Sequence, residues 1–131
     1  DDVESRGLGD VYKRQDLYHS MTVQVPIETR QGVHNVPISS IIMVEAQGKK
    51  VIVHTTARDY ESIHTMQYWL DQLPVNRFFQ THRSFIINYE HITNFDHMLV
   101  HLSNGQFTAY LTKRKYSAFK GAYLLYLEST R

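Results

Sequence analysis

Short stretches of alternating apolar residues, separated by turn signals at intervals of about ten residues, constrain the fold of this chain most strongly. The segment 21–27 shows this alternation, which is typical of a half-buried β-strand, and 98–102 is also predicted to be a strand. Two further segments, 66–73 and 116–127, have helical spacing instead. The pattern therefore predicts a mainly β domain with two short helices. The predicted turns are 30–32, 47–50, 56–59 and 103–105.

The two helical segments carry their own boundary signals. Thr65 is a predicted N-cap for the first helix, and Pro74 is expected to end it. The second helix is predicted from the spacing of Tyr116, Phe119, Tyr123, Leu124 and Leu127. We expect this stripe to pack in the core, although part of it is also suited to a dimer face.

Composition limits the class of protein. The chain has 131 residues, 42% of them hydrophobic, and no cysteine, which excludes disulfides and thiolate metal sites. No apolar run approaches the length of a membrane span, so we expect a cytoplasmic protein without membrane contact. Residues 1–15 show no regular period and are interpreted as a disordered or non-native leader. The predicted domain is 16–131.

The segment FFQTHRSFIIN, residues 78–88, has five consecutive polar residues between two apolar patches. A continuous buried strand would not tolerate this gap, whereas a polar segment held between two pieces of the core would. The flanking Phe and Ile residues are expected to hold the backbone. The polar residues between them are then available for a binding role.

Positive charge is unevenly distributed. The net charge is only +1, yet from Arg77 to Lys120 there are six basic and two acidic residues. Basic residues gather at three predicted turns or strand ends, namely 47–50, 80–84 and 112–115. A run of cations is often only a solvated face, but three convergent clusters would form a surface that follows phosphates.

The order of these features resembles the LytTR family, the DNA-binding output domain of many bacterial response regulators. The most specific motif is Phe79–Asn88, which is similar to the family pattern F-x-x-H-R-S-x-x-V-N. Ile41–Ala46, Gly48–Thr55 and Leu70–Pro74 are similar to other family segments, and the basic end of the last hairpin, 112–114, also matches. The resemblance covers about residues 21–127.

The resemblance implies an elongated arrangement of three small antiparallel sheets. It also implies sequence-specific binding of double-stranded DNA, with loops entering successive major grooves of tandem repeats. The family's base-reading positions fall on Arg83 and Arg114, whereas His82 is expected to fix its loop and Tyr110 to be core. The complete set of candidate DNA-binding residues is Gln47, Lys49, Lys50, Gln80, His82, Arg83, Ser84, Lys113, Arg114 and Lys115.

The same resemblance implies transcriptional regulation within a bacterial two-component system. Family regulators often carry an upstream receiver domain, for which there is no room before Met21. We therefore expect either a missing upstream receiver domain or a stand-alone regulator. A dimer on DNA is also implied by the resemblance.

Other functions are less favoured by the sequence. His97 and His101 lie four residues apart in a predicted strand, which is too far apart for a shared metal ion. No glycine-rich elbow surrounds Ser84, so neither a hydrolase nor any other enzyme is expected, and no cofactor is expected. The main alternative is a protein-interaction β module that uses the predicted edge strands within 21–38.

Overall fold

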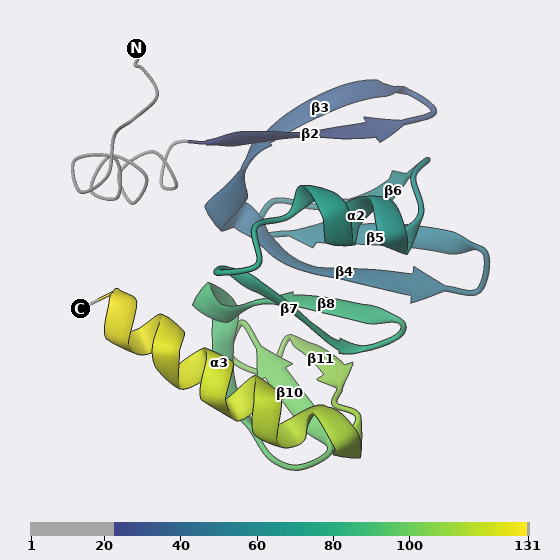
Figure 1. Cartoon of the computed structure of the whole chain (residues 1–131). Helices are drawn as coiled ribbons and strands as arrows, with labels where there is room; N and C mark the ends of the chain where they lie inside the picture. Colours follow the sequence, from purple (N-terminus) through teal and green to yellow (C-terminus); the bar gives the residue numbers. More distant parts are fainter. Residues whose placement is uncertain (1–22, 131) are drawn as a thin grey trace.

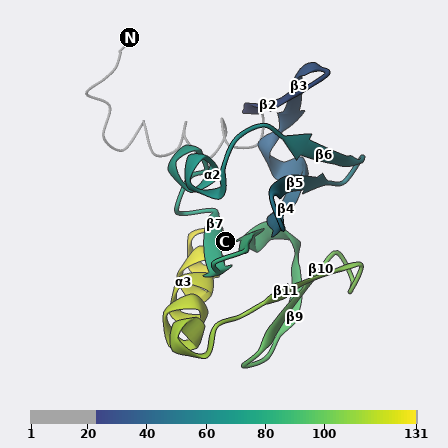
Figure 2. The same cartoon turned by 90° about the vertical axis from the view of Figure 1, so that its right-hand side faces the viewer.

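The computed structural model describes residues 23–130, and the predicted leader, 1–15, lies outside them. The described residues form three antiparallel sheets and two α-helices, which confirms the predicted mainly β fold (Figure 1). The sheets follow one another along the molecule, with the β2–β3 pair at one end and the β9–β11 sheet at the other (Figures 1 and 2). Neither helix in this part of the chain is long and apolar enough to cross a membrane.

The largest sheet has five strands in the order β6-β5-β4-β8-β7. Its strands are β4 (Ile41–Gln47), β5 (Lys50–Thr55), β6 (Asp59–Ser62), β7 (Phe78–His82) and β8 (Phe85–Asn88). A two-stranded sheet contains β2 (Gln24–Thr29) and β3 (Gly32–Pro37). A three-stranded sheet contains β9 (Ile92–Phe95), β10 (Leu99–Leu102) and β11 (Phe107–Tyr110). The helices are α2 (Met66–Gln72) and α3 (Tyr116–Ser129), with 3₁₀ turns η1 (Ile38–Ser40), η2 (Tyr89–His91) and η3 (Lys113–Lys115).

Strands β4 and β8 are buried on both faces of the central sheet. In β8, Ile86 belongs to one hydrophobic cluster, whereas Phe85 and Ile87 belong to the other. In β4 the register shifts between Ile41 and Met43, so the run of four apolar residues 41–44 can supply both clusters. These two strands therefore hold the molecule together.

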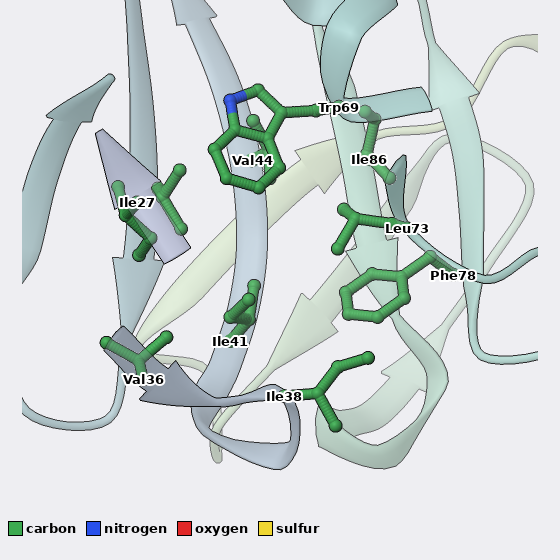
Figure 3. Packing of buried hydrophobic residues seen from close by; sticks show 10 residues of the cluster. Ile27, Val36, Ile38, Ile41, Val44, Trp69, Leu73, Phe78 and Ile86 are labelled. Atoms are coloured by element: carbon green, nitrogen blue, oxygen red, sulfur yellow. The ribbon is translucent and has the colours of Figure 1, made fainter. Parts of the chain in front are cut away.

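The first cluster lies between the central sheet, the β2–β3 pair and α2 (Figure 3). Trp69 of α2 is fully buried in it, and its indole Nε1 donates a hydrogen bond to Ser62 Oγ at 3.0 Å. The Thr65 hydroxyl accepts the Tyr68 backbone N–H, so the predicted N-cap is confirmed. The predicted helix 66–73 ends one residue earlier, at Gln72. Strand β6, which supplies Ser62, was not predicted.

The second cluster lies between the central sheet, the β9–β11 sheet and α3. Phe119 is fully buried and packs against the rings of Phe79 and Phe95. Leu127 was expected in this core but is 42% exposed. Tyr126 packs against the cluster instead, because its ring lies 5.1 Å from that of Tyr89.

Thr81 joins the central sheet to the β9–β11 sheet. It is fully buried, and its hydroxyl donates to the Tyr110 carbonyl at 2.8 Å. The Thr81 carbonyl accepts the Thr112 backbone N–H at 2.9 Å. The end of β7 is therefore hydrogen-bonded both to the last residue of β11, Tyr110, and to Thr112, which follows it.

We expect Thr81→Val to lower the free energy of unfolding by about 1–3 kcal/mol, because it removes the hydroxyl of a fully buried side chain that donates to the part-buried Tyr110 carbonyl. Urea unfolding followed by circular dichroism measures this change. The matched control is Thr108→Val, at an exposed position of β11, which is expected to stay within about 0.5 kcal/mol of the parent. Equal stability of the two variants would contradict the joining role of Thr81.

Candidate nucleic-acid interface

Three polar segments lie along one edge of the molecule. They are the β4–β5 turn, the β7–β8 turn and η3, which follows β11, and all three are on the right in Figure 1. These segments contain Lys49, Lys50, Arg83, Lys113 and Arg114, all of which are exposed. The sequence places no acidic residue within 47–50, 80–84 or 112–115. The edge is therefore strongly basic in a chain that is nearly neutral.

Backbone hydrogen bonds place the first two turns side by side. Strand β4 pairs with β8 in antiparallel register, with Glu45 opposite Phe85. The Ala46 N–H then extends this ladder by donating to the Ser84 carbonyl at 2.9 Å. Gly48 has a φ of +64°, which suits the first central residue of a tight two-residue turn between Gln47 and Lys50. The β4–β5 turn is thus short and fixed.

The second and third segments share a hollow. Its lining residues are Gln80, His82, Arg83, Thr112, Arg114 and Lys115. Lys115 Nζ donates to the Gln80 carbonyl at 3.0 Å, across the hollow from η3 to β7. Burial, followed by the charge of Arg114, lowers the pKa of the Lys115 ammonium. Lys115 therefore links the two segments and is less exposed than Lys113 or Arg114.

His82 supports the β7–β8 turn from within. Its Nδ1 accepts the Ser84 backbone N–H at 3.1 Å, so the ring proton resides on Nε2. The imidazole also packs against the rings of Phe85 and Tyr110, each at 5.8 Å. Arg83, which lies next to His82 at the tip of the β7–β8 turn, remains exposed to solvent.

Tyr110 was expected in the core, and this expectation is wrong. Its side chain is 60% exposed, and its ring covers His82 and Phe85 from the solvent side. The reason is strand alternation, since Ala109 and Leu111 on either side are both buried. The order Ala109-Tyr110-Leu111 was visible in the sequence. Strand alternation with Ala109 and Leu111 facing the core would have placed Tyr110 outward.

The β2–β3 turn lies on the same side of the molecule as the three basic segments, on the right in Figure 1. Arg30 and Gln31 in this turn are exposed. Sequence reasoning recognised the turn but did not count Arg30 among the candidate residues. By contrast, we do not count Arg77 among the residues of the basic edge, because its guanidinium forms an ion pair with Glu90 at 2.8 Å.

The histidines do not form a metal centre among the described residues, in which no three His, Asp or Glu side chains are placed so that they could hold a metal ion. His97 lies before β10 and outside the strand in which it was expected. Its ring stacks on Tyr116 at 4.0 Å, while His101 faces Thr108 across the β10–β11 pair. The two rings therefore have separate packing partners.

Comparisons with known proteins show the family and the fold of this chain. Residues 31–123 match the family model described as LytTr DNA-binding domain. A solved structure, the LytTr DNA-binding domain of a putative methyl-accepting/DNA response regulator from Bacillus cereus, matches with a TM-score of 0.65 and 28% identity. The match covers 76% of this chain and 94% of that one.

Two curated relatives are transcriptional or sensory regulators by name. The sensory transduction protein LytR of Staphylococcus epidermidis is 30% identical over 82 residues, which are 63% of this chain and 32% of that protein. The transcriptional regulatory protein NatR of Bacillus subtilis is 27% identical over 119 residues, or 87% of this chain and 51% of that protein. The matched regions thus span between a third and a half of these relatives. The family model covers most of the chain and the solved domain shares its fold, so this chain belongs to the LytTr DNA-binding domain family.

Proposed function

We propose that this domain binds double-stranded DNA sequence-specifically through the basic edge, with its turns entering successive major grooves. The observation that carries this proposal is the row of three basic segments held in register by hydrogen bonds between β4, β8, β7 and η3. A duplex lying along this edge would meet the segments in order. Phosphate contacts by their lysines would supply affinity, and side chains at base edges would supply specificity.

Individual roles follow from exposure and from hydrogen-bond partners. Arg83 and Arg114 are exposed around one hollow and are suited to bidentate contacts with guanine. Lys49, Lys50 and Lys113 are exposed cations suited to phosphates. Half-buried Gln80 and Ser84 are assigned contacts with the DNA backbone, whereas His82 and Lys115 hold the two segments in place.

We further propose that the domain acts as the output domain of a transcriptional regulator. The names of LytR and NatR support this role. An upstream receiver domain, tandem DNA repeats and a dimer on DNA are parts of the same proposal. Selection of bound duplexes from a random library would test the repeats, because two enriched half-sites at fixed spacing are expected.

We expect Arg83→Ala and Arg114→Ala each to reduce discrimination at one base-pair position by about 1–3 kcal/mol. Both side chains are exposed, so the free energy of unfolding should change by less than about 0.5 kcal/mol. Fluorescence anisotropy with the selected duplex and its single-base variants measures the discrimination.

The matched control for these variants is Arg58→Ala. Arg58 is an exposed arginine at the β5–β6 bend, and its guanidinium lies over the Tyr60 ring. It is expected to leave base preference unchanged. If Arg58→Ala weakened binding as much as Arg83→Ala, or if neither changed it, the assigned edge would be wrong.

Replacing Lys49, Lys50 or Lys113 with alanine should weaken binding to all sequences by similar factors. Each removed phosphate contact should lower the slope of log affinity against log salt by about 0.9. Titrations at several salt concentrations measure this slope. An unchanged slope would remove that lysine from the phosphate-contact set.

The alternative is protein recognition through the edge of β3. Among the described strands, β3 pairs only with β2, and Val33 on it is 58% exposed. A partner strand could extend this sheet. Under this alternative, Val33→Lys abolishes function while Arg83→Ala and Arg114→Ala have no effect. DNA binding predicts the opposite result.

A further inference from the structure

We propose that Glu45 is a positioning residue that orients the amide of Gln47 to recognise adenine in the major groove. The inference rests on the proposed DNA binding and names one base that the β4–β5 turn reads. It assigns a role to three residues, Glu45, His54 and Asp59, that the basic edge itself does not use.

A continuous chain of polar contacts ends at Gln47. Gln47 Nε2 donates to Glu45 Oε1 at 3.1 Å, and His54 Nε2 contacts the same oxygen at 2.8 Å. On its other side, His54 Nδ1 contacts Asp59 Oδ1 at 2.8 Å. Glu45 and Gln47 are two residues apart and therefore share one face of β4. Three strands, β4, β5 and β6, thus contribute to the chain.

Burial restricts the movement of this series of polar contacts. The His54 residue is only 6% exposed, and its ring packs against Phe107 of β11 at 4.9 Å. The charged groups that contact the imidazole are Glu45 from β4 and Asp59 from β6, while β11 contributes only an apolar ring. The Glu45 side chain is 22% exposed, and its contact with the buried His54 imidazole restrains the position of its carboxylate. An exposed glutamate on a free strand end would not be fixed in this way.

The chemistry of the carboxylate determines which way the Gln47 amide points. An ionised carboxylate only accepts hydrogen bonds, so the Gln47 atom next to Glu45 must be the nitrogen. Gln47 Oε1 is then directed away from Glu45. Gln47 itself is exposed at the end of β4, and within the described residues its side chain has no other hydrogen-bond partner.

This orientation fits adenine. Glutamine recognises adenine by accepting from N6 through its oxygen and donating to N7 through one amide proton. Glu45 uses one of the two Nε2 protons, which leaves the other proton and Oε1 for the base. Guanine presents O6, an acceptor, where adenine presents N6, so the oriented oxygen would face an acceptor and reject it.

The test is a comparison of base preference by the full chain. Duplexes are selected from a random library, and the affinity of the selected duplex is compared with single-base variants. The variants are Gln47→Ala, Glu45→Ala and the double variant. We expect one adenine position whose preference falls about 3- to 10-fold in Glu45→Ala, the equivalent of losing one hydrogen bond. The double variant should match Gln47→Ala, because Glu45 acts through Gln47.

The chain offers a matched control in Glu28→Ala. Glu28 Oε1 contacts His64 Nε2 at 2.9 Å, a second glutamate–histidine pair, and the substitution removes the same negative charge. Its base preference should equal that of the parent. Glu45→Gln keeps an oxygen that can accept from Gln47, so it should retain most of the adenine preference and should fold even if Glu45→Ala does not.

A second measurement needs no DNA. The side-chain amide protons of Gln47 are followed by nuclear magnetic resonance in the parent, Glu45→Ala and Glu28→Ala. We expect the Gln47 amide to lose its restricted mobility and hydrogen-bonded shift only in Glu45→Ala. An unchanged Gln47 amide in Glu45→Ala would overturn the inference.

The outcomes separate the inference from the function on which it rests. If the parent chain bound no duplex selectively, both would fail. If the parent were selective but Glu45→Ala kept the adenine preference, only the positioning role would fail. A loss of affinity spread equally over all base positions would also overturn it, because that result would indicate a general structural or charge effect.

Discussion

Burial of β4 and β8 on both faces is the constraint on which the rest of this structure depends. A strand that is apolar on both sides needs a layer above it and a layer below it. The β2–β3 pair with α2 provides one layer, and the β9–β11 sheet with α3 provides the other. Because β4 and β8 also lead into the β4–β5 and β7–β8 turns, the same burial that stabilises the cores fixes the position of the basic edge.

The third segment of that edge depends on a different interaction. The segment η3 follows β11, the last strand of the β9–β11 sheet, and it is brought beside the β7–β8 turn by Thr81 and Lys115. Arg83 and Arg114 therefore come from different sheets and meet only when both cores are packed. Recognition of one stretch of DNA by both arginines would require this tertiary contact, which no single hairpin could supply.

Local signals in the sequence were sufficient for much of the fold. The Thr65 cap, the turn at Gly48 and the helix beginning at Tyr116 are each specified by neighbouring residues. Strand β6 and the outward position of Tyr110 were missed, the first because its residues are polar and the second because its aromatic ring suggested the core. The Glu45–His54–Asp59 chain could not be predicted, since it depends on the register of three strands.

The turn tips contribute little to either core, and this separation has an evolutionary consequence. Exposed residues such as Lys49, Arg83 and Arg114 can be exchanged without disturbing Phe85, Ile86 or the cores they fill. Under the proposed DNA binding by these tips, a domain built in this way could acquire a new target by substitution at a few tips while its scaffold persists. Glu45 and His82 do not have that freedom, because Glu45 also contacts the buried His54 and His82 packs against the buried Phe85.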